Sequence, residues 1–394
     1  MLSFLVLLNP SISSAAVSTA QSTDLVIDFC TLQISWEEGF YWHLCKLSLI
    51  IELVHLPTHQ SLLHNHTQAT VFMPTSASLL ASAKGIKPQI VKKVCEKRTS
   101  SAYYWDGSGP LVVCLHGFPD TANTFHLMVP ALVGAGYRVL VPVMPGYEQS
   151  SVDPEGNYHI TDLAKNVVGW VDHMGEESAH LIGHDWGGVT AWLAAAMYPH
   201  RFFSVTSIAI PPLKHLGAAI LQCPSQILKS WYIGFFQLPL IPEQIIKFND
   251  GVFVRMLWRR WSPGWDAPEA LVRPVLDALD DPSVTGAMLG YYRCLGRIFH
   301  RQHQQGRRAL KLPYQVPCLM ISGSDDGCMD SRLFELAMSE NDFMAGAELY
   351  RLMGAGHFCH LEKPALVHAK LLSFLEMHPK GAKKLADELA KQLG

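Results

Sequence analysis

The sequence predicts an α/β fold with a mostly parallel central sheet flanked by helices. Short apolar runs rich in Val, Ile and Leu recur from residue 109 onward, as is typical of strands buried on both faces. Stretches with apolar residues three and four positions apart, such as 160–174 and 189–198, lie between them and indicate helices. Strands that alternate with helices in this way form parallel sheets covered on both sides.

Six apolar runs are expected to be the core strands. In chain order they are residues 109–117, 136–143, 178–184, 202–210, 316–323 and 347–354. Ligands of such sheets bind at the carboxyl ends of the strands, so the functional residues are expected in the loops that follow these runs.

One long stretch, residues 212–310, breaks the alternation. It holds no convincing buried strand, is rich in Trp and Tyr, and is punctuated by Pro. We expect a helical lid over the strand ends, inserted between the core segments 101–211 and 311–378; a helical subdomain beside the sheet is the alternative. Residues 1–100 are expected to form an atypical, poorly ordered extension, and residues 379–394 a charged helical tail.

Composition narrows the choice of partner. Among 394 residues, 31 basic and 34 acidic side chains give a net charge of −3, without the Lys/Arg stripe that favours nucleic acid or an anionic membrane. A small molecule is the expected partner. The nine cysteines are scattered singly, which is typical of reduced thiols. Because no CxxC motif or Cys/His cluster has metal spacing, we expect no metal, and no cofactor is expected either.

The amino terminus bears on the compartment. The run MLSFLVLL resembles the core of a short signal peptide, but no basic residue precedes Lys46. Residues 47–54 are too short to span a bilayer and contain Glu52. We expect a cytoplasmic protein, with a secretory or membrane-associated one as the alternative; the sequence does not predict an oligomeric state.

The third strand leads into Gly183-His184-Asp185-Trp186-Gly187, which has the G-x-nucleophile-x-G spacing of a sharp strand-to-helix bend. Glycines let the strand and the helix approach each other, and the bend lifts the side chain of Asp185 above the sheet. The backbone N–H of Trp186 then lies at a helix start, where it can bind an anion. Taken alone, Asp185 is equally well explained as a helix N-cap.

Other strand ends carry residues that match this bend. The first strand is followed by His116-Gly117-Phe118-Pro119, a tight turn whose Phe118 N–H would join that of Trp186 as an oxyanion-hole donor; an ordinary Gly-Pro turn is the alternative. GSDDGC follows the fifth strand and GAGHFCH the sixth. An acid and a histidine therefore succeed the nucleophile in the chain order of a hydrolytic triad.

From about residue 102 to 377 the chain resembles the α/β-hydrolase superfamily, and within it the epoxide hydrolase branch. The motifs that carry the resemblance are HGFPD, GHDWGG, SWYIGFFQLP, GYYRC, SGSDDG and GHF. The resemblance implies a hydrolase with the α/β-hydrolase fold, a helical lid and an aspartate nucleophile. Haloalkane and haloacetate dehalogenases share the same bend.

Placed on this sequence, the family pattern implies that Asp185 is the nucleophile and His357 the base. The acid falls on Asp326 rather than Asp325, because the family acid stands three residues after the Gly that ends the strand.

The resemblance also implies two lid tyrosines that activate the epoxide oxygen, Tyr232 and Tyr292. Tyr291 is the less favoured neighbour, since the reactive tyrosine directly precedes Arg293 in the family pattern. Packing within an aromatic lid is the alternative role for both tyrosines.

These residue types suit the opening of an epoxide to a vicinal diol. A carboxylate that attacks a saturated carbon forms an ester, which water can cleave, whereas a serine would leave an ether. An aspartate is ionised at neutral pH and needs no activation, so His357, oriented by Asp326, is free to activate the water of the second step. The expected partners are thus an apolar epoxide and water.

Two other functions remain as alternatives. A dehalogenase would use the same Asp185, but it binds halide with indole or amide N–H groups, and Phe118 stands where many dehalogenases have Asn. The lid tryptophans that could bind a halide are Trp231, Trp258, Trp261 and Trp265. A non-catalytic receptor with this fold is the lesser alternative.

The chain departs from the family pattern before residue 109. A short hairpin of strands is usual there, and only residues 88–97 and 101–109 resemble it. If these strands were missing, the stability of the sheet would be in doubt.

Overall fold

The computed structural model describes residues 87–95 and 98–378. The N-terminal extension expected up to residue 100 lies almost wholly outside the described residues, and the C-terminal tail at 379–394 lies outside them altogether. Within the described ranges, no helix is both long and apolar enough to cross a membrane.

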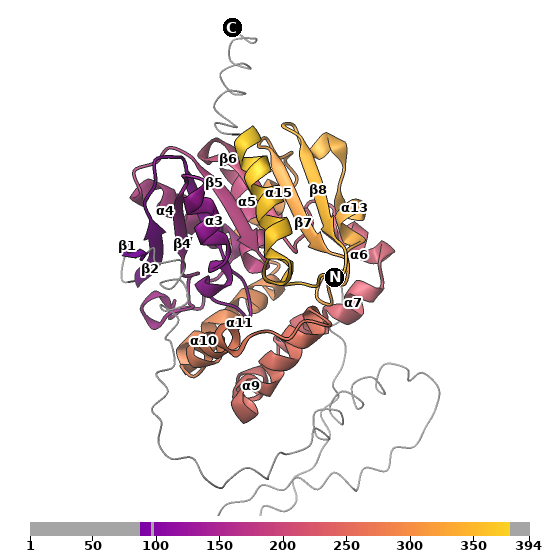
Figure 1. Ribbon diagram of the computed structural model, residues 1–394. Coiled ribbons are helices and arrows are strands. Elements are labelled where there is room, and N and C mark those ends of the chain that lie inside the picture. Colours follow the sequence, from indigo (N-terminus) through magenta and orange to yellow (C-terminus); the bar gives the residue numbers. More distant parts are fainter. Residues whose placement is uncertain (1–86, 96–97, 379–394) are drawn as a thin grey trace, which may run out of the picture. The chain divides into compact units, whose positions relative to one another are not determined.

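The core is an eight-stranded sheet with the strand order β1-β2-β4-β3-β5-β6-β7-β8 (Figure 1). The strands are β1 (Gln89–Cys95), β2 (Arg98–Trp105), β3 (Leu111–Leu115), β4 (Arg138–Pro142), β5 (Ala179–His184), β6 (Phe202–Ile208), β7 (Cys318–Gly323) and β8 (Ala347–Leu352). β2 is antiparallel to both β1 and β4, and the remaining neighbours pair in parallel. The mostly parallel α/β sheet is thus confirmed, and each of the six expected runs contains a strand.

The N-terminal hairpin, for which the sequence pattern gave little support, is present in the sheet. β1 pairs with β2 from Gln89 opposite Tyr104 to Cys95 opposite Arg98, and β2 then pairs with β4. The sheet therefore begins at Gln89, ahead of the expected core boundary at residue 101. The strand is hard to recognise because β1 lies at the edge of the sheet, carries two lysines and exposes Val94.

Helices cover both faces of the sheet, because alternate residues of each buried strand point to opposite sides and both sets are apolar. α3 (Met128–Gly134) and α15 (Pro364–Met377) pack on one face, seen in front of the strands in Figure 1. α4 (Ile160–His173) and α5 (Trp186–Met197) pack on the other. Short helical turns in the connections are η2 (Ala122–Phe125), η3 (Gln149–Ser151), η4 (Pro199–Arg201), α13 (Leu333–Ala337), η5 (Glu340–Asp342) and α14 (Cys359–Glu362).

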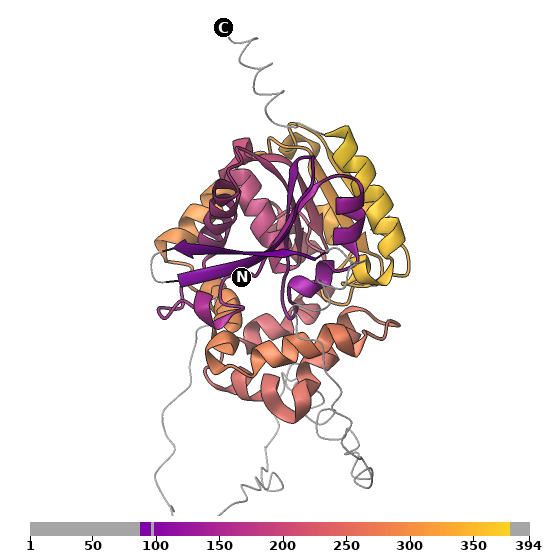
Figure 2. The same cartoon turned by 60° about the vertical axis from the view of Figure 1, so that its left-hand side comes forward.

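The segment between β6 and β7 is helical. Its helices are α6 (Leu216–Gln222), α7 (Ser225–Lys229), α8 (Trp231–Phe235), α9 (Ile241–Trp261), α10 (Glu269–Leu279), α11 (Pro282–Gly296) and α12 (Arg301–Ala309). Most of them gather at one end of the sheet, where Figure 2 shows them in salmon and orange. The Trp258 indole donates to the Pro119 carbonyl, and the His357 N–H donates to the Trp261 carbonyl. The inserted helices therefore contact the loops at the carboxyl ends of the strands.

Candidate active site

The bend after β5 holds Asp185 in a strained backbone conformation. Asp185 has φ 50° and ψ −119°, in a region that residues with a side chain rarely adopt. The bend needs glycine on both sides, because a Cβ on Gly183 would lie 2.1 Å from the Gly187 carbonyl oxygen and one on Gly187 would lie 2.0 Å from that of Leu115. Asp185 stands at the N-cap position of α5, but within the described chain its side chain makes no capping hydrogen bond to that helix and is left for another role.

Three predicted residues from separate strand ends meet at this bend, and we call Asp185, Asp326 and His357 the first cluster. All three are buried. The Nδ1 of His357 lies 2.9 Å from Asp326 Oδ2, and its Nε2 lies 3.6 Å from Asp185 Oδ2. Because a carboxylate can only accept, Nδ1 carries the proton that is donated to Asp326, and Nε2 faces Asp185 without a hydrogen bond from any described residue.

Asp326 is distinguished from its neighbour by its contacts. Its Oδ1 accepts the backbone N–H groups of Cys328 at 2.7 Å and Met329 at 2.8 Å, which leaves Oδ2 for His357. Asp325 is exposed and accepts a hydrogen bond from the Ser324 hydroxyl instead. The geometry therefore agrees with the sequence expectation that Asp326, and not Asp325, pairs with the histidine.

The surroundings of His357 favour its charged form. Burial by itself lowers the pKa of the imidazole, but the acidic groups around it, among them the carboxyl groups of Asp326 and Asp185, outweigh burial and raise the pKa well above its ordinary value. One of these contributions comes from the side chain that Nε2 faces, Asp185. A reaction that neutralises Asp185 would therefore make His357 a more available base.

The turn after β3 brings a backbone donor to the same carboxylate. The Phe118 N–H donates to Asp185 Oδ1 at 2.7 Å. The turn is held by His116, whose Nε2 accepts the Met144 N–H at 3.0 Å and whose Nδ1 lies 3.2 Å from the Gly117 carbonyl oxygen. Burial lowers the pKa of His116 to about 4, so its ring is neutral at neutral pH.

Trp186 is the residue whose backbone N–H is expected to be the second donor at this site. It is the first residue of α5, so its N–H belongs to the helix N-terminus, where the first N–H groups have no partner within the helix. The turn after β3 requires glycine at position 117, since a Cβ there would lie 2.4 Å from Asp185 Oδ1.

The Trp258 indole N–H donates to the Pro119 carbonyl at 2.8 Å. That indole N–H is therefore committed and is not a free halide donor.

The two favoured tyrosines lie together beside Trp186 and Phe118. Tyr232 on α8 and Tyr292 on α11 are buried, with ring centroids 5.8 Å apart. The Tyr292 ring also contacts those of Trp186 at 5.1 Å and Phe118 at 5.3 Å. Burial raises the pKa of both phenols well above the ordinary value, and the charge of Asp185 raises it further. Both hydroxyls are therefore protonated at neutral pH.

Tyr291 is occupied elsewhere. Its hydroxyl donates to the Pro145 carbonyl at 2.6 Å, and its ring stacks on that of Tyr158 at 5.3 Å. The Tyr292 hydroxyl has no hydrogen-bond partner in the described part of the chain. Of the two adjacent tyrosines, Tyr292 thus has the free phenol near Asp185.

Cys328 is a member of the site that sequence reasoning missed. Its Sγ lies 3.3 Å from the Tyr232 hydroxyl, and it gathers with Asp185 and His357 within 4.8 Å. Burial raises the pKa of the thiol, which favours its neutral form. Its only sequence signal is its position two residues after Asp326, and no known motif spacing assigns a role to that position.

Comparisons with known proteins agree with this fold. A family model described as an alpha/beta hydrolase fold matches residues 110–242. The AB hydrolase superfamily protein YfhM of Bacillus subtilis is 34% identical over 272 residues, which cover 68% of this chain and 91% of that protein. Epoxide hydrolase A of Mycobacterium tuberculosis is 29% identical over 298 residues, covering 68% of this chain and 90% of that protein.

A solved structure extends the similarity to three dimensions. Epoxide hydrolase A of Mycobacterium thermoresistibile is 26% identical to this chain, with a TM-score of 0.58. The match covers 74% of this chain and 98% of that one. Similarity of sequence and of fold thus extends over nearly the full length of these relatives. The chain belongs to the α/β-hydrolase superfamily, and it is a hydrolase similar to the epoxide hydrolases.

Proposed function

We propose that this protein opens apolar epoxides to vicinal diols through a covalent ester of Asp185. The observation that carries the proposal is the presence of two buried, protonated phenols, Tyr232 and Tyr292, beside a buried carboxylate at a strained bend. An epoxide oxygen leaves as an alkoxide and needs a proton, which a phenol can give. The relatives named epoxide hydrolases support the same substrate class.

The first step forms the ester. Asp185 Oδ1 is held by the Phe118 N–H, so Oδ2 is the oxygen that attacks a ring carbon of the epoxide. The carbon–oxygen bond of the ring breaks, its electron pair moves to the oxygen, and that oxygen takes a proton from Tyr232 or Tyr292. The products are a hydroxyalkyl ester and a tyrosinate.

The second step hydrolyses the ester. Once the charge of Asp185 is lost in the ester, His357 releases its Nε2 proton to solvent; the neutral ring takes a proton from water, and the resulting hydroxide attacks Cγ of Asp185. The negative charge that develops on Oδ1 is stabilised by the N–H groups of Phe118 and Trp186, a kind of contact worth about 3–4 kcal/mol per donor. Collapse releases the diol oxygen, which takes the proton back from His357. The new carboxylic acid returns a proton to the tyrosinate, and His357 regains its Nε2 proton from solvent, so the cycle closes.

The aromatic rings beside Tyr292 indicate the substrate class. Phe118, Trp186 and Phe236 contact Tyr292 with ring centroids 4.9–5.3 Å away. Aromatic surroundings favour an apolar epoxide, because a charged group would lose its hydration there without gaining a partner.

Single-turnover labelling tests the proposal. Enzyme in excess over epoxide, in water enriched in ¹⁸O, should place the label in the peptide that carries Asp185 and leave the first diol unlabelled. Diol formation without label in that peptide would overturn the ester mechanism. The substrate panel comprises small, aromatic and fatty-acid epoxides beside haloacetates and bromoalkanes, with Asp185→Asn as the blank.

The panel also separates the alternative functions. Halide release without diol formation from any epoxide would establish a dehalogenase that uses the same carboxylate. Saturable binding without either product would establish a receptor. Both outcomes overturn the proposal.

A further inference from the structure

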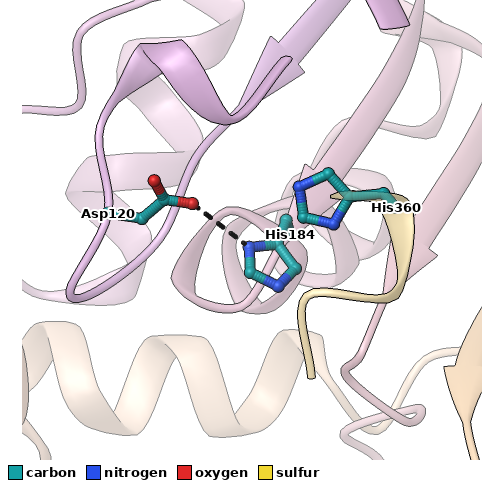
Figure 3. A group of neighbouring side chains, drawn as sticks. All are labelled: Asp120, His184 and His360. Atoms are coloured by element: carbon teal, nitrogen blue, oxygen red, sulfur yellow. Dashed lines mark ion pairs between the residues drawn. The ribbon is translucent and has the colours of Figure 1, made fainter. Parts of the chain in front are cut away.

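A second buried group of a carboxylate and imidazoles lies next to the first cluster. It consists of Asp120, His184 and His360, here called the second cluster (Figure 3). Asp120 follows the turn after β3, His184 ends β5, and His360 lies in α14 after β8. All three side chains are at most 1% exposed. The proposed reaction uses none of them.

Each residue of the second cluster has one buried polar atom without a partner. Among the described residues, Asp120 Oδ2, His184 Nδ1 and His360 Nδ1 accept and donate no hydrogen bond. One carboxylate oxygen of Asp120 and one ring nitrogen of each histidine lie within 4.8 Å of one another, and His184 Nδ1 is 3.8 Å from Asp120 Oδ2. Buried polar atoms are rarely left unpaired, so the neighbouring Oδ2 of Asp120 and Nδ1 of His184 call for a shared occupant.

The hydrogen bonds of the two imidazoles determine what that occupant must be. His184 Nε2 lies 3.1 Å from the His357 carbonyl oxygen, which can only accept, so Nε2 carries the proton and Nδ1 presents a lone pair. His360 Nε2 lies 2.6 Å from the Thr124 hydroxyl, which can donate or accept. In the tautomer that donates from Nε2 to this hydroxyl, His360 Nδ1 also presents a lone pair.

We propose that Asp120, His184 and His360 bind a divalent transition-metal ion, of which Zn²⁺ fits best. A cation would accept the lone pairs of Asp120 Oδ2 and His184 Nδ1 together, and a ring nitrogen of His360 would be the third ligand. Two imidazole nitrogens and one carboxylate oxygen form a ligand set that zinc favours, and water would take the fourth position. Ligand atoms around a tetrahedral zinc lie roughly 3.3–3.5 Å apart, close to the separation of His184 from Asp120.

The hydrogen bonds and pKa values of the proposed ligands are consistent with metal binding. Histidines that bind metals usually donate their other N–H to a carbonyl or another oxygen, as His184 does to the His357 carbonyl. Burial lowers the pKa of His184 well below its ordinary value and that of His360 to about 3, so both rings are neutral and ready to bind at neutral pH. Asp120, whose pKa burial raises to about 7, would lose its proton when the metal binds.

The ion would connect the loops that carry the first cluster. Asp120 follows Phe118 by two residues, His184 directly precedes Asp185, and His184 Nε2 donates to the backbone of His357. A metal bound at this point would therefore fix the oxyanion turn, the bend and the histidine loop relative to one another. Its role is positional, because it does not touch the reacting atoms.

One other set of ligand atoms must be distinguished from the second cluster. Asp185, Cys328 and His357 also lie within 4.8 Å of one another. A metal there would involve a thiolate and would block both the nucleophile and the base. The two sites differ in ligand chemistry, since the second cluster contains no sulfur.

Metal content and the cobalt spectrum of the full chain test the proposal. The protein is expressed with added zinc, analysed for metal, stripped with a chelator and titrated with Zn²⁺ or Co²⁺. We expect one equivalent per chain, the visible absorption of tetrahedral Co²⁺ without a thiolate-to-cobalt band, and a Tm raised by at least about 2 °C. Absence of stoichiometric metal and of any Tm shift would overturn the proposal and leave a protonated Asp120 with trapped water as the explanation.

Variants locate the ion. Asp120→Asn and His360→Asn should lose it, whereas Cys328→Ser and His180→Asn should keep it. His180 is a matched control, because it is equally buried, lies on the same strand as His184 and also has one ring nitrogen without a partner among the described residues. A thiolate band, or metal lost in Cys328→Ser and kept in His360→Asn, would overturn the site. If a variant fails to fold, the cobalt spectrum of the unmodified chain decides alone.

Discussion

The first and second clusters are built from the same residue types and lie against each other, yet their protons are arranged in opposite ways. The rings of His184 and His357 are in contact, with centroids 4.9 Å apart. In the first cluster, His357 directs its N–H to Asp326, and the pKa of the imidazole is raised. In the second cluster, His184 directs its N–H to the His357 carbonyl and its Nδ1 lone pair toward Asp120, and the pKa values of His184 and His360 are lowered.

This difference decides what each cluster can do. An imidazole whose N–H is directed to a carboxylate presents its other nitrogen to the substrate side and can take up and return a proton. Imidazoles whose lone pairs converge on a carboxylate suit a bound cation. The direction of one hydrogen bond, and not the choice of side chains, separates proton transfer from ion binding.

The same substitution in both clusters gives the largest expected contrast. Asp185→Asn should lower the rate of diol formation by about 10⁴-fold or more, because it removes the nucleophile. Asp120→Asn should lower it by roughly tenfold, because it changes only the support of the loops. Steady-state diol formation measures both, with circular dichroism as the check on folding. Equal losses in two folded variants would break the division between a reacting and a positioning cluster.

His357→Gln should separate the two steps of the reaction. The ester should still form, since Asp185 attacks without a base, but its hydrolysis should slow by roughly 10³-fold. Intact-protein mass spectrometry after addition of epoxide should reveal one stoichiometric adduct. His360→Asn is the matched control and should not accumulate it. If neither variant accumulates adduct while turnover is lost in His357→Gln, the histidine acts before ester formation and the proposed order of steps is wrong.

How much the sequence predicts differs between the two clusters for a physical reason. Buried parallel strands are continuous apolar runs, so the strands, and with them Asp185 and His357 at their ends, can be located from pattern and order. Asp120, His184 and His360 come from three distant segments, and the topology of the sheet alone brings them together. Metal spacing along the chain, on which the expectation of no metal rests, cannot detect such a site.

Individual residues were likewise predictable only where a sequence pattern marked them. Asp326 was separable from Asp325 by the family pattern, and the hydrogen bonds give the physical reason, since only Asp326 faces His357. Cys328 had no signal, because its place beside Tyr232 depends on how α8 packs over the loop after β7. The edge strand β1 was weak in the sequence because it exposes one face and is held by backbone pairing with β2.

Substitutions of the adjacent residues Tyr292 and Tyr291 should give a smaller contrast in rate. Tyr292→Phe should slow ester formation by about 10²-fold, because it removes a proton donor for the leaving oxygen. Tyr291→Phe should change that rate by less than about threefold and cost about 1 kcal/mol of stability, since its hydroxyl only holds the Pro145 carbonyl. Single-turnover kinetics and thermal unfolding measure the two effects. A larger kinetic loss in Tyr291→Phe would reverse the assignment of the two residues.

The pH dependence gives the mildest test of the first cluster. The pKa of His357 is raised in the free enzyme, so its base form is depleted as the pH falls, by up to about tenfold per unit once the pH is below that pKa. Ester formation does not need the base form, and both phenols keep their protons because their pKa values are raised. Lowering the pH should therefore slow the decay of the ester more than its formation, and the fraction of enzyme found as ester should rise.

Quenched single turnovers at a series of pH values measure both rates. Because ester formation neutralises Asp185, the apparent pKa of ester decay should lie below that of His357 in the free enzyme, which a direct titration by NMR provides. Equal slowing of formation and decay would mean that His357 does not act as the base of the second step alone. Decay that is unaffected by pH would remove it from that step, and the contrast between the two clusters would then have to rest on metal binding.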